Sequence, residues 1–424
     1  MDKSYSQEMV SFRRAFHKRP EEGWTEFETM YRVVSRLREL GWNVVMGTAA
    51  VNPQYVMGRN EQLIEKAKTR ALSHGVTQAF LDETQGYTGC VAILETGIPG
   101  PVTMFRFDMD CVMVEETLDP SHEANVGGYA SEIMGQMHAC GHDGHTAVGL
   151  GVAHWVMDHK DELKGTIKLL FQPAEEGTRG GLPMSESGLL DDVDYILCGH
   201  IGTSAHLGEV GVTESGFLAT QKIDITFTGK PAHAGANPED GRSALLAACN
   251  AATTLTGIPR NGKGDTRVSV GKLVAGEGRN VVPVHAAMQI EVRASSEEVN
   301  QYMVDYVQRI VEGCAMAYDV SFSITKVGAA TVLKSDPDMV QSVIDIAKSL
   351  PTVKRAYVES GVSGSEDASW LIRKVQSHGG KGAFFVFGCN HHGHHKADFS
   401  IQDEQSLPNG FAIFTKFLQL ENHR

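Results

Sequence analysis

The sequence has no apolar run that approaches the roughly 20 residues of a transmembrane helix. Residues 1–8 also lack the apolar core of a secretory signal peptide, so we expect a cytoplasmic location. Basic residues are in the minority, with 38 Lys and Arg against 52 Asp and Glu and a formal net charge of −14. A chain of this charge is poorly suited to nucleic acid or to an anionic membrane, and neither is an expected partner.

Cysteine is also sparse, and its spacing shows no pairing pattern. The seven cysteines are an odd number scattered along the chain, at Cys90, Cys111, Cys140, Cys198, Cys249, Cys314 and Cys389. Without an export signal we expect reduced thiols, most of them filling the core. Cys140 differs from the others because it alone lies among other residue types that bind metals.

The length and the order of apolar patterns predict two domains. A chain of 424 residues is too long for one ordinary core. Strand-like and helix-like patterns alternate, which predicts an α/β domain with a mostly parallel sheet and helices on both faces. Between about 222 and 326 the order is strand-helix-strand-strand-helix-strand, typical of a ferredoxin-like α+β domain. We therefore expect a catalytic domain at 1–215 and 331–424 and an inserted domain at 216–330.

Residues 52–86 form the least expected segment. Within it, 60–73 has the periodicity of an amphipathic helix that carries many charges. Three interpretations stay open: a solvated addition to the surface, a docking site for a partner, or a cover for the substrate.

The strongest motif lies at 137–147. Three histidines, one cysteine and one aspartate fall within eight positions there, His138 to His145. Cys140 and His142 are two residues apart, so a turning backbone can direct both side chains at one point. A thiolate and an imidazole together suit zinc, manganese or a related divalent ion.

Further candidate ligands follow strand-like runs elsewhere in the chain. Glu175 and Glu176 come after one run, and two adjacent carboxylates there can divide the roles of metal ligand and general base. His200 follows a second run, and Asp108 follows a third, where it could orient a ligand. Four more histidines lie at 391–395. Ser365 and Asp367 are expected to cap the helix that begins at Ala368.

Together these motifs resemble the metal-dependent amidohydrolases and aminoacylases, a metallopeptidase-like family that includes hippurate hydrolases and indole-acetyl-amino-acid hydrolases. The resemblance covers nearly the full length. It is carried by Arg13-Arg14, His17, Pro20-Glu21, Asp108-Met109-Asp110, the Cys140 loop, Gln172-Pro173-Ala174-Glu175-Glu176-Gly177, Gly199-His200 and Gly364-Ser365-Glu366-Asp367.

The resemblance implies a site for two divalent metal ions, Mn²⁺ or Zn²⁺. Cys140 matches the thiolate that bridges both ions, Glu175 matches the general base and Asp108 matches an orienting carboxylate. The remaining ligands implied are His142, Glu176, His200 and His395. His395 is preferred over its neighbours because the family pattern has an aromatic residue four positions later, here Phe399.

The inserted domain resembles the family's lid, which also forms a dimer. His233 matches a histidine that reaches the partner subunit's active site and stabilises the oxyanion. Asn280 and Arg293 match residues that hold polar groups of the substrate, and a guanidinium suits a carboxylate. The implied assembly is a homodimer, and a homologous second subunit is a further possibility.

The implied reaction is hydrolysis of the amide bond of an N-acyl amino acid. The expected substrate is p-aminobenzoyl-glutamate, which would give p-aminobenzoate and glutamate. Two alternatives stay open: an aminoacylase or peptidase for another acyl amino acid, or a subunit that needs a homologous partner chain for activity.

Overall fold

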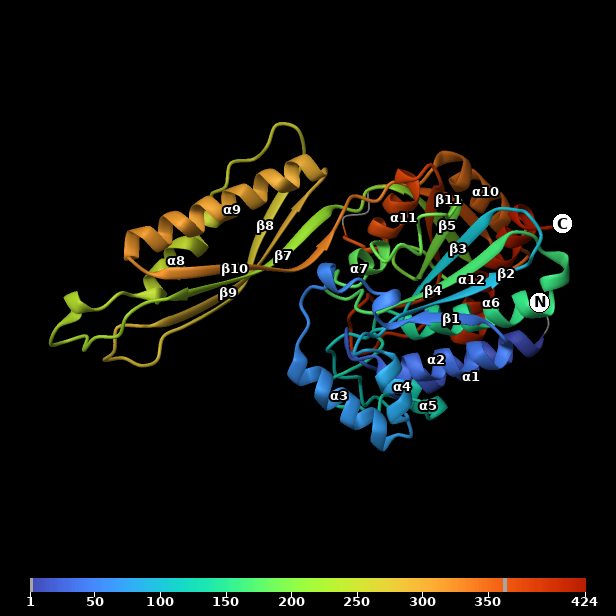
Figure 1. Cartoon of the computed structure of the whole chain (residues 1–424), viewed down its shortest axis with the longest axis horizontal. Helices are drawn as coiled ribbons and strands as arrows, with labels where there is room; N and C mark the ends of the chain where they lie inside the picture. The colour runs from blue at the N-terminus through green and yellow to red at the C-terminus, as the bar shows by residue number, and fades with distance from the viewer. Residues whose placement is uncertain (1–2, 361–363) are drawn as a thin grey trace. The chain divides into compact units, whose positions relative to one another are not determined.

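The computed structural model describes residues 3–360 and 364–424. Its chain forms two compact units (Figure 1). Unit 1 contains residues 1–216, 333–362 and 367–424, and unit 2 contains residues 217–332 and 363–366. The predicted fold class is confirmed, because unit 1 is built on a large, mostly parallel sheet with helices and unit 2 on a second sheet.

An eight-stranded sheet is the centre of unit 1. Its strands are β1 (Asn43–Met46), β2 (Cys90–Glu95), β3 (Val102–Asp108), β4 (Thr166–Gln172), β5 (Tyr195–Ile201), β6 (Glu209–Ser215), β11 (Arg355–Ser360) and β12 (Lys381–Phe387), in the order β1-β2-β4-β3-β5-β12-β6-β11. The central strands β4, β3, β5 and β12 are parallel neighbours. Their carboxyl ends therefore meet at one edge, the place where such sheets carry their sites.

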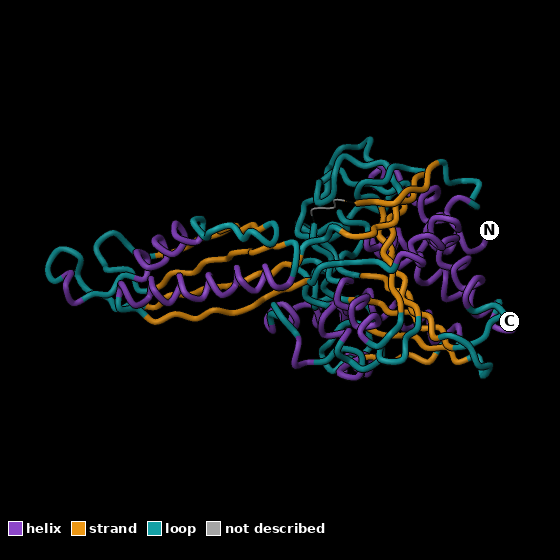
Figure 2. Tube along the Cα trace, turned by 90° about the horizontal axis from the view of Figure 1, so that it is seen from above, coloured by secondary structure: helices purple, strands orange, loops and turns teal. Residues whose placement is uncertain are grey.

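Helices cover both faces of this sheet (Figure 2). The helices of unit 1 are α1 (Lys3–His17), α2 (Phe27–Leu40), α3 (Glu61–Ser73), α4 (Gln78–Glu83), α5 (Glu123–Gly127), α6 (His142–Asp158), α7 (Gly181–Ser185), α10 (Pro337–Lys348), α11 (Ala368–Ser377) and α12 (Asp403–Glu421), of which α6, α10, α11 and α12 are among those packed on the sheet. On one face, the ring of Phe414 in α12 lies 4.8 Å from that of Phe105 and 5.1 Å from that of Phe385. On the other face, Ile372 of α11 packs against Gly382 of β12.

Unit 2 is a four-stranded antiparallel sheet with two helices. Its strands are β7 (Ala219–Thr228), β8 (Thr266–Ala275), β9 (His285–Ala294) and β10 (Ser321–Ala330), in the order β10-β7-β9-β8, and its helices are α8 (Ala244–Leu255) and α9 (Glu297–Tyr318). Alternate residues of the central strands, such as Ile225 and Ile290, pack with Ala248 of α8 and Val307 of α9 in one core. The other face of this sheet carries polar side chains, as the period of two requires.

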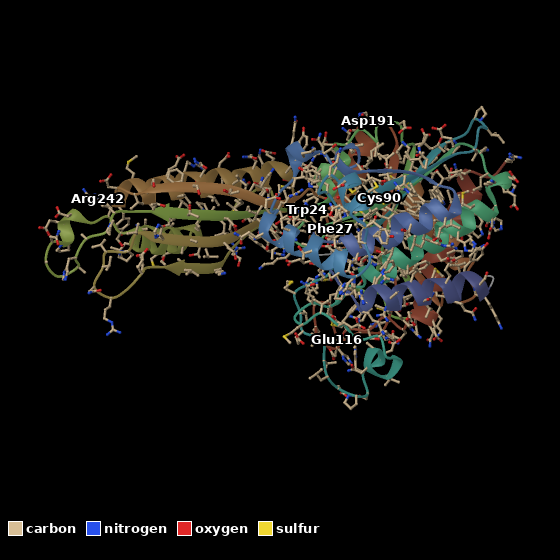
Figure 3. All side chains as sticks on the ribbon, turned by 60° about the horizontal axis from the view of Figure 1, so that its bottom comes forward. Trp24, Phe27, Cys90, Glu116, Asp191 and Arg242 are labelled. Carbon is tan, nitrogen blue, oxygen red and sulfur yellow. The ribbon has the colours of Figure 1, made fainter. Side chains whose placement is uncertain are left out.

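The segment at 52–86 is packed onto unit 1. Three apolar residues of α3 are buried, including Ile64. Arg70 of the same helix forms ion pairs with Glu21 at 2.8 Å and with Glu28 at 3.1 Å. The buried Trp24 indole donates a hydrogen bond to the Met57 carbonyl at 2.9 Å (Trp24 is labelled in Figure 3). The inner face of this segment is therefore part of the core, which a purely solvated addition would not be.

Among the described residues, no helix is both long enough and apolar enough to cross a bilayer. All seven cysteine side chains are free thiols, and only Cys249 is exposed.

Candidate active site

Three neighbouring parallel strands bring their carboxyl ends to one edge of the unit 1 sheet. Asp108 is the last residue of β3 and is paired in register with Gln172, the last residue of β4. Glu175 and Glu176 follow within four residues of that strand end. His200 lies near the end of β5, on the other side of β3. Residues far apart in the sequence are thus held together by the strand pairing alone.

The Cys140 loop enters this edge through a turn that only glycine can make. Gly141 has φ of +87°, and a Cβ added there would lie 2.3 Å from Ile201 Cγ2. Helix α6 begins directly after it, at His142. The turn places the Cys140 sulfur and the His142 ring beside the end of β5, and the positive end of the helix faces the site.

The five predicted metal ligands lie together. Cys140 Sγ is 3.6 Å from His200 Nε2, and His395 Nε2 is 3.0 Å from Glu176 Oε1. Ligand atoms lie within 4.8 Å of one another in three overlapping groups: Cys140 with His142 and His200, Cys140 with Glu176 and His395, and His142 with Glu175 and Glu176. Cys140 is the one residue shared by the first two groups, which together contain all five predicted ligands, and this is the position a bridging ligand would need.

The hydrogen bonds made by His142 and His200 are those expected of histidines that bind a metal. His142 Nδ1 donates to the Asp110 carbonyl at 2.9 Å, and His200 Nδ1 donates to the Ile201 carbonyl at 2.8 Å. In its neutral form each ring therefore has an Nε2 lone pair that can bind a cation, as ligating histidines do. His142 Nε2 is buried and has no hydrogen-bond partner among the described residues. Burial and then the Glu176 carboxylate raise the pKa of the Cys140 thiol well above its ordinary value, and a bound cation would offset that cost.

Asp108 orients a histidine, but that histidine is not one of the predicted ligands. Its Oδ1 accepts a hydrogen bond of 2.5 Å from His145 Nδ1, and His145 Nε2 in turn accepts one from the Ile201 N–H at 2.8 Å. The other oxygen lies 3.7 Å from His142 Nε2. Burial opposes ionisation of Asp108, but the charge of Arg106 outweighs it and holds the pKa of Asp108 well below the ordinary value.

Asp110 is a site residue that the sequence analysis did not single out. Its two oxygens accept hydrogen bonds from the main-chain N–H groups of Glu175, at 3.0 Å, and of Glu176, at 2.9 Å. It therefore fixes the turn that carries both carboxylates. The available signal was its position in the Asp108-Met109-Asp110 motif, two residues beyond Asp108 on an extended backbone.

The expected capping role of Asp367 is wrong. Asp367 occupies the N-cap position of α11 but makes no side-chain capping bond there. Its carboxylate instead accepts hydrogen bonds from the Gly180 N–H at 3.0 Å, the Gly181 N–H at 2.7 Å and the Gln172 side chain at 2.7 Å. Ser365 donates to the Leu218 carbonyl at 2.9 Å. Asp367 thus supports the loop that follows Glu176, because the two glycine N–H groups there, together with the Gln172 side chain, outcompete a local cap.

The insertion reaches the same turn through Arg179. Arg179 Nε donates to the Glu176 carbonyl at 3.0 Å, and its NH1 donates to the carbonyl of Gly58 at 3.1 Å. Segment 52–86 is therefore linked to the Glu175–Glu176 turn by one side chain.

Two of the late histidines face the site. His395 lies beside Glu176, while His394 Nδ1 is 3.4 Å from Cys140 Sγ. His394 Nε2 already accepts a hydrogen bond of 2.8 Å from the Thr203 N–H. Burial, then the nearby His391 and His395, lowers the pKa of His394 to about 3. His394 is thus a neutral neighbour of the cysteine that the sequence pattern did not reveal.

The three lid residues lie in unit 2 and are not all together. His233 and Asn280 are on adjoining loops: His233 forms a β-bridge with Val281, and the Ala234 N–H donates to the Asn280 carbonyl at 3.0 Å. Arg293 is near the opposite end of β9, which starts at His285. At about 3.3 Å per residue, β9 separates Arg293 from those loops by roughly 25 Å.

Comparison with known proteins identifies the family. Residues 104–420 match the model of peptidase family M20/M25/M40. The chain belongs to this family. The predicted family of metal-dependent amidohydrolases is therefore confirmed, and so is the prediction of a hydrolytic enzyme.

The similarity to known proteins extends over almost the whole chain. One from Haemophilus influenzae, named as a homolog of a p-aminobenzoyl-glutamate hydrolase subunit, is 43% identical over 414 residues, 97% of this chain and 98% of its own. The indole-3-acetyl-aspartic acid hydrolase of Enterobacter agglomerans is 42% identical, covering 93% of this chain and 92% of its own. The crystal structure of an aminobenzoyl-glutamate utilization protein from Klebsiella pneumoniae has a TM-score of 0.81 at 36% identity, covering 97% and 96%.

Proposed function

We propose that the chain hydrolyses the amide bond of p-aminobenzoyl-glutamate and releases p-aminobenzoate and glutamate. The observation that carries the substrate is the 43% identity, over nearly the full length, to the relative named for that reaction. The relative named for indole-3-acetyl-aspartic acid favours an N-acyl aspartate as a second candidate. Both candidates are amides of an acidic amino acid.

The proposed metal site holds two divalent ions, manganese or zinc. Cys140, His142, Glu176, His200 and His395 would hold the ions, with Cys140 shared between the two groups of ligands. The thiolate and imidazole groups suit zinc, while the carboxylate suits manganese equally well. When bound, the ions would polarise the amide carbonyl and lower the pKa of a water molecule.

Glu175 is the proposed general base. Its main chain is fixed by Asp110, and its Oε2 lies 3.9 Å from His142 Nε2, at the edge of the ligand cluster. The carboxylate accepts a proton from the attacking water and passes it to the leaving nitrogen. Glu176 is paired with His395 and serves as a ligand, so the two adjacent carboxylates have separate tasks.

The lid supports a homodimer. His233 is proposed to stabilise the oxyanion, with Asn280 beside it, and Arg293 to hold the substrate carboxylate. One lid cannot offer all three to one substrate, because β9 separates Arg293 from the other two by roughly 25 Å. We propose that each substrate meets Arg293 of one chain and His233 and Asn280 of the partner subunit.

The test is a panel of amides given to the purified chain alone. We expect p-aminobenzoyl-glutamate to be hydrolysed best, N-acyl aspartates next and N-acyl leucine or alanine least. A clear preference for aliphatic amino acids would reject the proposed substrate. Activity that appears only after a homologous chain is added would show that the chain is one subunit of a hetero-oligomer.

A further inference from the structure

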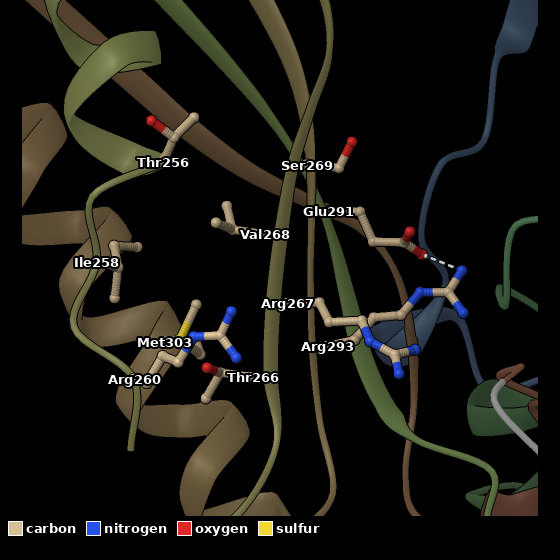
Figure 4. A pocket seen from close by; sticks show the side chains of 10 residues that line it. All are labelled: Thr256, Ile258, Arg260, Thr266, Arg267, Val268, Ser269, Glu291, Arg293 and Met303. Atoms are coloured by element: carbon tan, nitrogen blue, oxygen red, sulfur yellow. Dashed lines mark ion pairs between the residues drawn. The ribbon is translucent and has the colours of Figure 1, made fainter.

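A cavity of about 600 Å³ lies within unit 2 along the edge strand β8 (Figure 4). Its polar wall is formed by residues of β8 and β9 on the face of the sheet away from the helices: Arg267, Ser269, Glu291 and Arg293. Arg293 is paired in register with Thr220, three residues after unit 2 begins at Phe217. This end of β9 therefore lies beside the start of unit 2.

The wall is positively charged although the whole chain carries −14. Glu291 is its one carboxylate and is already engaged. Its Oε1 lies 3.0 Å from Arg293 NH2 and accepts a hydrogen bond of 3.1 Å from Thr220 Oγ1. Arg293 therefore keeps part of its guanidinium available, and Arg267 adds a second positive charge. A concave positive surface on an acidic protein favours an anionic ligand.

Arg267 is the charged member of this wall whose side chain has no partner among the described residues. It is the direct register partner of Arg293 across β8 and β9, so the two Cβ atoms are about 5 Å apart. Like charges in that position destabilise a sheet. No described residue forms an ion pair or hydrogen bond with the guanidinium of Arg267, and this residue is exposed. The fold gains nothing from this arginine pair, which points to a bound anion that compensates it.

We infer that Arg267 binds the side-chain carboxylate of the leaving amino acid, next to Arg293, which holds the α-carboxylate. The inference rests on the proposed function and specifies its substrate class: amides of dicarboxylic amino acids. The α-carbon and two methylene groups separate the carboxylates of glutamate, a spacing that suits two guanidinium groups on adjacent strands. Each guanidinium can pair with one carboxylate through two parallel hydrogen bonds.

The test compares p-aminobenzoyl-glutamate with p-aminobenzoyl-glutamine, which has nearly the same shape and lacks one charge. The wild-type chain should prefer the glutamate substrate in kcat/KM by about 10- to 100-fold, the range for a charge-assisted hydrogen-bond pair. Arg267→Gln should lose most of that preference by lowering kcat/KM for the glutamate substrate alone. Arg267→Lys, which keeps the charge, should retain an intermediate preference.

Arg260→Gln is the matched control. Arg260 lines the same cavity but lies on the helix side of β8, with Ile258 and Met303 (Figure 4). Removing its charge should leave the ratio between the two substrates unchanged.

Three results would overturn the inference, and they are distinguishable. If the wild type hydrolyses p-aminobenzoyl-glutamate but Arg267→Gln keeps the full glutamate preference, the inference is wrong and the proposed function stands. If Arg267→Gln slows both substrates equally and changes the oligomeric state in size-exclusion chromatography, Arg267 serves a subunit contact. If the wild type hydrolyses neither amide, the proposed function fails and the inference fails with it.

Discussion

The guanidinium of Arg106 lies 2.8 Å from the carboxylate of Asp108, and both side chains are completely buried. Arg106 also donates a hydrogen bond of 2.8 Å to the Gln172 side chain, so it connects β3 to the strand that precedes the Glu175–Glu176 turn. Asp108 in turn holds His145. One buried cation therefore supports the carboxylate that orients His145.

Arg106→Leu should destabilise the protein strongly. The variant leaves the Asp108 charge buried without its partner, which costs about 3–5 kcal/mol of unfolding free energy. Urea denaturation measures the change. Arg355→Leu, which removes an exposed arginine paired with Glu209 at 3.4 Å, should cost no more than about 1 kcal/mol. Equal losses in the two variants would contradict a special role for the buried pair.

Asp110→Asn should slow catalysis and leave the fold intact. An asparagine can accept only one of the two main-chain hydrogen bonds from Glu175 and Glu176, so the turn is no longer fixed. A displacement of about 1 Å at a reacting group costs on the order of 100-fold in rate. We expect kcat to fall by that order while KM changes little. Asp119→Asn, in an exposed loop, is the control, and a kcat for Asp110→Asn equal to that of the control would contradict the prediction.

The sequence was sufficient for the parts of the site whose residue types are unusual for their positions. A cysteine between histidines indicates a metal site when it is considered together with a Glu-Glu pair after a strand, and these motifs also identified the family. It was not sufficient for Arg106, Asp110 and Asp367, because a charged residue near a strand end or helix start has many ordinary roles. Asp367 and Gly180 are 187 residues apart and meet only in the folded chain.

The same limit applies to unit 2. The order of strands and helices predicted a ferredoxin-like domain, and local patterns are enough for that. The sequence did not show that His233 lies beside Asn280, because this depends on which loops adjoin in the folded domain. It also did not show that both residues lie at the opposite end of β9 from Arg293. The pairing of Arg267 with Arg293 depends on strand register in the same way.

Stability should decrease as the pH rises from about 4.5 to about 8, because of Glu26. Burial and then the Asp110 carboxylate raise the pKa of Glu26 to about 8, against about 4.3 in an unfolded chain. Between these values the folded state binds the proton more tightly than the unfolded state. The unfolding free energy therefore falls with rising pH, by up to about 1.4 kcal/mol per unit for this one group.

Glu26→Gln tests this dependence, because glutamine stays neutral at every pH. Its side chain can still accept the hydrogen bond from the Ala174 N–H, 2.8 Å long in the wild type, and can donate to Thr88. Urea denaturation between about pH 5 and pH 8 should give a flatter profile than the wild type. Glu39→Gln, an exposed carboxylate of α2, should keep the wild-type slope. A Glu26→Gln profile parallel to the wild type would show that Glu26 is ionised throughout.

A mixture of two inactive variants should regain activity if the lid acts across subunits. His233→Ala lacks the side chain that stabilises the oxyanion, and Glu175→Gln lacks the general base. In a mixed dimer the chain with intact Glu175 receives His233 from its partner, which restores one site in two. Random exchange should therefore give about one quarter of the wild-type rate. No recovery, with exchange verified by native mass spectrometry, would mean that His233 acts within its own chain.

The most direct measurement is metal content and p-aminobenzoate release of Glu175→Gln, compared with the wild type and with Cys140→Ser. Glu175→Gln should keep about two ions per chain, as the wild type does, and release p-aminobenzoate at least about 100-fold more slowly. Cys140→Ser should lose metal as well as activity. A near-normal rate for Glu175→Gln, or a wild-type metal content in Cys140→Ser, would contradict a two-metal site with Glu175 as its base.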